Sequence, residues 1–170
     1  MRFFFASPCK LTAMRFEIPD HKILVHEIRF PMHWGEMDAL GHINNAMYFR
    51  YMEQARVTWI ASINNGQVNS DDEGPVIANT FCNFYRPLVF PGDLVARLYV
   101  ANPGRTSIDT FVNIERADEP GTVYAAGGAT LVWVSMKDGR PVPLPSAIKA
   151  LEGQLPALPG TDKPPALPEK

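Results

Sequence analysis

Five polar side chains of types that can do chemistry lie within ten positions of this chain: Glu36, Asp38, His42, Asn44 and Asn45. A carboxylate can act as a nucleophile or activate water, and an imidazole can transfer a proton. Most other runs of the sequence are apolar or alternate between apolar and polar residues. We therefore take this segment as the candidate catalytic site.

The residues after this segment predict one long helix that must hold the polar side chains at its N-terminus. Asn44 or Asn45 is a suitable N-cap, because a short amide side chain can accept from the unpaired N–H groups of a first turn. Apolar residues then recur at three- and four-residue steps from Tyr48 to Ile63, and Asn64-Asn65-Gly66 predicts the C-terminus. About twenty residues at about 1.5 Å each give a rod near 30 Å long.

Five other stretches are typical of strands, because they alternate or are rich in β-branched and aromatic residues: 22–31, 76–90, 94–100, 106–116 and 123–136. Gly127-Gly128 in the last stretch predicts a bulge or a bend. Short turns join the last four stretches, and strands joined in this way are antiparallel neighbours. The sequence therefore predicts an α+β fold, in which an antiparallel sheet of about five strands curls around the helix.

Composition limits the classes of function. A length of 170 residues with 46% hydrophobic residues indicates one domain with a sizeable core. The formal net charge of −2 gives no electrostatic reason to expect nucleic acid or an anionic membrane as a partner. Cys9 and Cys82 show no metal-type spacing and suggest a reducing, cytoplasmic setting. No apolar run approaches the roughly 20 residues of a membrane span.

We expect a poorly ordered N-terminal extension over 1–20, a folded domain over 21–153 and a Pro-rich tail over 154–170. The start of the chain resembles a signal peptide, but its apolar run ends too early, and Met14 could equally be the natural start. The prolines after Leu155 predict an extended, loosely held tail.

The run from Asp38 to Tyr48 follows the pattern Asp-x-x-Gly-His-[Val/Ile]-Asn-Asn-x-x-Tyr, which resembles the signature of the 4-hydroxybenzoyl-CoA thioesterase group of hotdog-fold proteins. Residues 85–88 and 91–93 also resemble segments of that group, and the similarity covers 22–140. The resemblance implies a hotdog fold and an enzyme that hydrolyses acyl-CoA thioesters. It also implies a homodimer or a homotetramer, with active sites at the protomer interface.

The chemistry of such a site can be reasoned from the residues. A thioester carbonyl needs a nucleophile or an activated water, and hydrogen-bond donors for its oxygen as it becomes tetrahedral. The start of the helix offers unpaired N–H groups, and its positive end favours anions by up to ~2 kcal/mol, which would keep Asp38 ionised. By the resemblance, Asp38 carries catalysis and the backbone N–H near Asn45 donates to the carbonyl. Whether Asp38 attacks directly or deprotonates water stays open; neither route calls for a metal or a cofactor.

Other residues of the motif have alternative roles. His42 could donate a proton or bind substrate, as a similar segment of plant acyl-carrier-protein thioesterases suggests, or it could orient the loop. Gly41 would allow a tight turn and close approach of substrate to the backbone. Asn44 is expected to cap the helix beside the substrate, and Tyr48 to line the core or the acyl pocket. Arg86 is a further substrate-binding candidate.

Charged residues outside the motif receive less specific predictions. Arg105, like Arg86, could contact the phosphates of coenzyme A. Glu53 is expected to pair with Arg50 or Arg56 at helical spacing. Glu36 is expected to be solvated.

Two alternative functions remain open, a thioesterase for acyl groups on acyl carrier protein and a non-catalytic hotdog domain that binds acyl thioesters. The mildly acidic composition does not favour the first, and an ionised Asp38 beside a carbonyl would not help the second. A hotdog dehydratase would carry its Asp and His on another motif. Val95, Tyr99 and Phe111 are candidates for an exposed apolar patch that would decide between dimer and tetramer.

Overall fold

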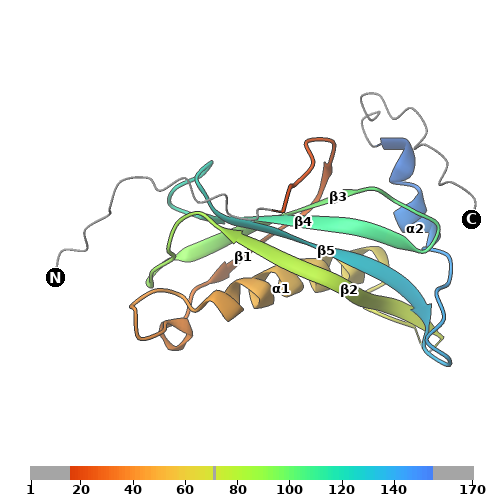
Figure 1. Cartoon of the computed structure of the whole chain (residues 1–170), viewed down its shortest axis with the longest axis horizontal. Helices are drawn as coiled ribbons and strands as arrows, with labels where there is room; N and C mark the ends of the chain where they lie inside the picture. The colour runs from red at the N-terminus through yellow and green to blue at the C-terminus, as the bar shows by residue number, and fades with distance from the viewer. Residues whose placement is uncertain (1–15, 71, 155–170) are drawn as a thin grey trace, which may run out of the picture.

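The computed structural model describes residues 16–70 and 72–154, so the predictions for the chain start, Cys9 and the Pro-rich tail lie outside the described residues. Figure 1 shows a curved sheet with one helix lying along it. In chain order the elements are β1 (Ile23–Pro31), η1 (Trp34–Glu36), α1 (Asn45–Ile63), β2 (Glu73–Phe84), β3 (Asp93–Ala101), β4 (Ser107–Arg116), β5 (Val123–Ser135), α2 (Ser146–Lys149) and η2 (Glu152–Gln154).

The sheet has the strand order β1-β3-β4-β5-β2, and each neighbouring pair is antiparallel. Its inner face packs against α1, which confirms the predicted α+β fold. The helix has 19 residues, or about 28 Å at 1.5 Å per residue. The helix is shorter than β5, whose 13 residues extend over about 43 Å.

Side chains alternate across the sheet as the sequence predicts. Leu94, Ala96 and Leu98 of β3 are fully buried on the inner face, whereas Arg97 between them reaches the outer face, where it pairs with residues of β1 and β4. Val95 and Phe111 are also buried, so the predicted apolar patch on the outer face is not exposed.

Gly127 and Gly128 lie in regular register with both neighbouring strands, so the predicted bulge does not occur there. The register of β5 with β4 shifts instead between Ile114 and Glu115. A Cβ at Gly127 would meet the backbone oxygen of Phe81 and the end of the Met52 side chain of α1. The glycine therefore allows the helix and the sheet to approach closely at this point.

The second predicted strand is shorter than expected at its C-terminal end. It was predicted to reach residue 90, but β2 stops at Phe84, and the N–H groups of Tyr85 and Arg86 both donate to the carbonyl of Tyr124. Pro87 follows and has no N–H for the ladder. The Leu88 carbonyl then accepts from Ile43 N–H at 2.8 Å, which ties this segment to the loop before α1.

Candidate functional site

The loop between η1 and α1 is held by its own backbone. Met37 and Ile43 form an antiparallel bridge. The N–H of Asp38 donates to the carbonyl of His42 at 2.8 Å, and the N–H of Gly41 donates to the carbonyl of Asp38 at 3.0 Å. Gly41 has a φ of 75°, which glycine adopts without strain, so the predicted tight turn is present.

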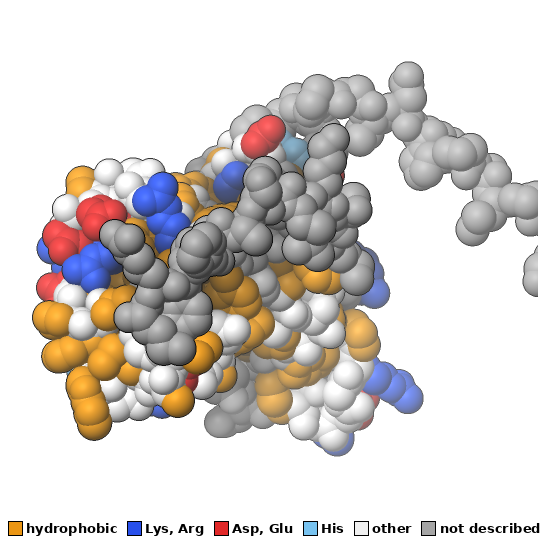
Figure 2. Space-filling model, turned by 60° about the vertical axis from the view of Figure 1, so that its left-hand side comes forward, with side chains coloured by type: hydrophobic (Ala, Val, Ile, Leu, Met, Phe, Trp, Pro, Cys, Tyr) orange, Lys and Arg blue, Asp and Glu red, His pale blue; other side chains and the backbone are white. Residues whose placement is uncertain are grey.

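Asp38 is half-buried within this loop. Its Oδ1 accepts from Leu40 N–H at 2.8 Å, and within the described part of the chain Oδ2 has no hydrogen-bond partner. Two large apolar side chains near it reach solvent, since Trp34 is 72% exposed and Leu40 is 79% exposed. Figure 2 turns this end of the molecule toward the reader and shows exposed hydrophobic side chains on it. The carboxylate therefore lies beside an apolar surface.

The N-terminus of α1 has the predicted cap. Asn44 is the N-cap, and its side-chain oxygen accepts from Ala46 N–H at 2.9 Å. The N–H of Asn45 has no partner among the hydrogen bonds of the described residues. A first-turn N–H cannot be paired within its own helix, so this donor is free for an oxygen that carries negative charge.

A hollow of about 260 Å³ opens at this helix end. His42, Asn45 and Tyr48 line it from the loop and α1, and Phe84 and Arg86 line it from the end of β2 and the segment after it. The structure thus brings together four of the seven predicted site residues. The other three, Asp38, Gly41 and Asn44, lie in the adjoining loop but do not form its wall.

The side chain of Tyr48 contacts residues on two sides of this hollow. Its hydroxyl oxygen accepts from Leu88 N–H at 3.1 Å, and its ring packs edge-on against Phe84 with centroids 5.0 Å apart. Burial raises the pKa of this hydroxyl, so it stays protonated at neutral pH. Tyr48 therefore holds the walls of the hollow together.

Glu36 is not solvated as predicted. Its Oε2 accepts from His33 N–H at 2.8 Å and from the Tyr51 hydroxyl at 2.6 Å. Burial, followed by the hydrogen bond to Glu36, raises the pKa of Tyr51 far above its usual range. The spacing of His33 and Glu36 is that of a capping box, which the sequence could have revealed, but nothing in the sequence indicates the contact with Tyr51.

Other polar residues have no part in the wall of this hollow. Arg105 follows β3 whereas the hollow lies before it, so Arg105 does not line the hollow of its own chain, and its contact with coenzyme A stays a prediction. Within the described residues Glu53 forms no ion pair with Arg50 or Arg56. Burial raises the pKa of the Cys82 thiol to about 12, so this thiol is not an activated nucleophile.

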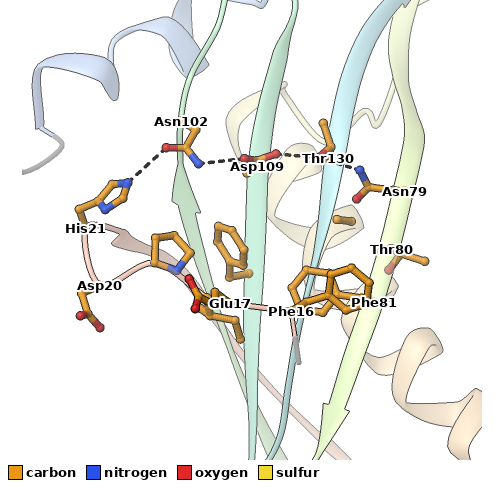
Figure 3. Close-up of a pocket in the computed structure, with 14 residues that line it drawn as sticks. Phe16, Glu17, Asp20, His21, Asn79, Thr80, Phe81, Asn102, Asp109 and Thr130 are labelled. Atoms are coloured by element: carbon orange, nitrogen blue, oxygen red, sulfur yellow. Dashed lines mark hydrogen bonds between the residues drawn. The ribbon is translucent and has the colours of Figure 1, made fainter. Parts of the chain in front are cut away.

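A larger hollow lies elsewhere, on the outer face of the sheet, and measures about 880 Å³. Figure 3 shows a row of hydrogen bonds across it that links His21, Asn102, Asp109, Thr130 and Asn79. Phe16 stacks on Phe81 beside this row, with ring centroids 4.9 Å apart. Across residues 16–70 and 72–154, no group of three His, Cys, Asp or Glu residues could hold a metal ion.

The chain belongs to the thioesterase-like superfamily, whose defining pattern matches residues 32–151. The predicted hotdog fold and the predicted membership of a class of thioester-hydrolysing enzymes are thereby confirmed. A solved structure described as a candidate thioesterase of Pseudomonas aeruginosa is 33% identical, with a TM-score of 0.72 over 76% of this chain and 99% of that chain. A candidate acyl-CoA thioesterase of Xanthomonas campestris is 32% identical, with a TM-score of 0.64 over 72% of this chain and 100% of that chain.

A curated relative is the chloroplastic acyl-acyl carrier protein thioesterase ATL3 of Arabidopsis thaliana. It is 30% identical over 129 residues, which cover 74% of this chain and 66% of the relative. The chain thus spans just under two thirds of that relative's length.

Proposed function

We propose that this protein hydrolyses acyl-CoA thioesters to the free acid and coenzyme A, with Asp38 as the catalytic carboxylate. The observation that carries the proposal is the unpaired N–H of Asn45 at the positive end of α1, in a hollow next to the loop of Asp38. An oxyanion needs such a fixed donor. The similarity to a candidate acyl-CoA thioesterase of Xanthomonas campestris supports coenzyme A as the carrier.

The reaction can follow two balanced routes. In one route Oδ2 of Asp38 attacks the carbonyl carbon, the C–S bond breaks, and water then cleaves the mixed anhydride. In the other route Asp38 takes a proton from water, and the resulting hydroxide attacks the carbonyl. In both routes the N–H of Asn45 donates to the carbonyl oxygen as negative charge develops on it, and the thiolate of coenzyme A leaves and takes up a proton.

The remaining motif residues support this chemistry by position. His42 lines the hollow and can donate to the substrate, and Arg86 also lines it, where a phosphate of coenzyme A could reach it. Asp38 stands outside this wall, and a second protomer would complete the site between them. We therefore expect a homodimer or a homotetramer with active sites at the protomer interface.

The setting of the enzyme remains a prediction. No helix in the described ranges is both long and apolar enough to cross a membrane. The expectation of a cytoplasmic setting rests on the unlike contexts of Cys9 and Cys82 in the sequence.

The test is hydrolysis of a panel of acyl-CoAs by the wild type, Asp38→Ala and Asp38→Asn. We expect kcat/KM to fall by at least about a hundredfold in both variants, the scale for losing one principal catalytic group. Asp20→Ala is the matched control, because Asp20 is an exposed carboxylate beside the larger, outer hollow. Asp38 has no part in the mechanism if its variants keep the wild-type rate.

A second candidate carrier is acyl carrier protein, which the name of the Arabidopsis relative favours. The two carriers share the thioester but differ in size and charge. Comparing kcat/KM for one acyl group on coenzyme A and on acyl carrier protein distinguishes them. We expect the value for coenzyme A to be higher, since the chain has a net charge of −2 and acyl carrier protein would require a basic docking surface.

A further inference from the structure

The segment between β2 and β3, residues 85–92, is held by other parts of the chain at its start, its middle and its end. The two N–H groups at its start donate to the carbonyl of Tyr124 in β5. Its middle residue Leu88 is fully buried. Near its end the side chain of Arg116, the last residue of β4, donates to two carbonyl oxygens. We call residues 85–92 the β2–β3 segment.

Leu88 joins the β2–β3 segment to both parts of the candidate site. Its carbonyl accepts from Ile43 N–H at 2.8 Å, and Ile43 lies in the loop that carries Asp38. Its own N–H donates to the hydroxyl of Tyr48 at 3.1 Å, in the first turn of α1. Both contacts are made by the main chain of Leu88, so they depend on where the segment lies. A shift of the segment would therefore move both the loop of Asp38 and the start of α1.

Arg116 holds the other end of this segment with a rigid, oriented group. Its Nη1 donates to the carbonyl of Val89 at 2.9 Å, and its Nη2 donates to the carbonyl of Pro91 at 3.3 Å. The guanidinium also donates to both carboxylate oxygens of Asp118, from Nε at 2.9 Å and from Nη2 at 2.8 Å. A planar guanidinium that a carboxylate binds along one edge presents its remaining N–H groups in a fixed direction.

The guanidinium of Arg116 also lies close against the main chain of the β2–β3 segment. A Cβ added at Gly92 would meet Nη2 of Arg116 at 2.8 Å and its Cζ at 3.0 Å. Only 16% of the Arg116 side chain is exposed, against 62% of the Asp118 side chain. The contacts from Arg116 to the segment are therefore shielded from water more than the outer part of its ion pair.

We propose that Arg116 is a positioning residue of the candidate active site, because it holds the β2–β3 segment where Leu88 supports the loop of Asp38. The inference rests on the proposed function, since it gives Arg116 an effect on acyl-CoA hydrolysis. Arg116 does not line the smaller hollow, so it acts through the main chain of the segment. A reacting group must stay within about 0.5 Å of its productive place, and supporting contacts of this kind keep it there.

The experiment compares acyl-CoA hydrolysis by the full-length wild type, Arg116→Ala and Asp118→Asn, at a temperature where circular dichroism shows each protein folded. We expect kcat of Arg116→Ala to fall about tenfold, because a small displacement far from the chemistry is costly. Asp118→Asn keeps both contacts to the segment and loses only an exposed ion pair, so its kcat should stay within about twofold of the wild type.

Arg97→Ala is the matched control, because Arg97 also binds two partners, Glu27 and Glu115, and neither lies in the β2–β3 segment. We expect it to lower stability and to leave kcat unchanged. Added methylguanidinium should restore kcat of Arg116→Ala to within about threefold of the wild type, because it can occupy the place of the lost group. A loss of stability alone would not be reversed, since guanidinium ions weaken the burial of apolar groups.

Hydrogen exchange of the Ile43 and Leu88 amides, measured by NMR, tests the same inference without a substrate. We expect both amides to exchange about tenfold faster in Arg116→Ala and at the wild-type rate in Arg97→Ala. Unchanged exchange in Arg116→Ala, faster exchange with an unchanged kcat, or no recovery with methylguanidinium would each overturn the proposal. A wild type that hydrolyses no acyl-CoA would overturn the proposed function, and the exchange rates would still decide whether Arg116 holds the loop of Asp38.

Discussion

The two faces of the sheet are held by different forces. On the inner face, fully buried side chains such as Leu98 and Val112 pack against Met52 of α1. On the outer face, polar side chains link neighbouring strands in rows, as in the contacts from Arg97 to Glu27 and Glu115. The inner face is therefore fixed by close packing and the outer face by directional contacts that water can replace.

Because the two faces are held differently, the volume of a hollow does not indicate whether its polar groups are free to bind a ligand. The outer hollow is the larger, at about 880 Å³ against about 260 Å³, yet its central carboxylate is already satisfied. Asp109 accepts from Asn102 at 2.9 Å through one oxygen and from Thr130 at 2.7 Å through the other. The smaller hollow has a free N–H at Asn45 because Asn45 is the first residue of α1, where an N–H has no partner within the helix. A free donor, rather than volume, marks the candidate site.

The adjacent glycines of β5 test the comparison most strongly, because one faces each side. An added methyl at Gly127 would meet the backbone oxygen of Phe81, which cannot move without the sheet. An added methyl at Gly128 would meet the rings of Phe111 and Phe81 beside the outer hollow, and those rings can swing into it. We expect Gly127→Ala to lower the free energy of unfolding by about 3 kcal/mol and Gly128→Ala by about 1 kcal/mol.

Urea denaturation followed by circular dichroism measures both values on the same preparation. Gly153→Ala controls for the change in backbone freedom, because an added methyl at Gly153 meets nothing within 4 Å. Equal losses at Gly127 and Gly128 would show that the outer face is packed as firmly as the inner one.

Tyr51→Phe tests the inner side of the sheet, because it removes one hydrogen bond from α1 and leaves the packing of the ring in place. The Tyr51 hydroxyl holds Glu36 at 2.6 Å, and Glu36 holds the start of the loop that carries Asp38. Loss of a hydrogen bond to a charged group should cost about 1.5–3 kcal/mol of unfolding free energy. We expect kcat/KM for acyl-CoA to fall by about tenfold as the loop loses its anchor.

The control for this variant is Tyr99→Phe, because Tyr99 lies half-buried on the outer face and its hydroxyl has no recorded partner among the described residues. If Tyr51→Phe has wild-type stability and activity, the hydrogen bond from Tyr51 to Glu36 does not hold the loop that carries Asp38.

The smallest expected effect concerns pH and the outer face. Glu115 is 4% exposed; burial raises the pKa of its carboxyl, but hydrogen bonds from Arg97 at 2.6 Å and from Gly121 N–H at 2.8 Å outweigh burial and hold the pKa below its usual value. The folded state thus favours the ionised form more than the unfolded state does. This contribution to stability is complete above the ordinary pKa of about 4.3 and is lost as the pH falls through the lowered value.

We therefore expect the unfolding free energy of the wild type to fall more steeply between about pH 5 and pH 3 than that of Glu115→Gln. Urea titrations at a series of pH values measure both slopes. Parallel curves for the two proteins would show that this outer-face pair contributes nothing to acid stability.

The local patterns in the sequence predicted most of the elements correctly. Alternation located the strands to within a few residues, and the amide of Asn44 marked the start of α1. These features depend on residues close together in the chain, so the sequence contains the information directly. The boundary of β2 was wrong because the carbonyl of Tyr124, far along the chain, ends the ladder at Phe84.

The features of the candidate site also fall into those that the sequence predicts and those that only the structure shows. The sequence by itself determined the motif from Asp38 to Tyr48, its place before a helix and the chemistry that a carboxylate beside free N–H groups can do. Only the tertiary structure decided that Tyr51 holds Glu36 and that Nη1 of Arg56 is buried with no hydrogen-bond partner among the described residues. These contacts join distant parts of the chain or require an account of what surrounds a side chain in space. Helical spacing alone predicted an ion pair of Glu53 with Arg50 or Arg56, whereas the described residues hold no such pair.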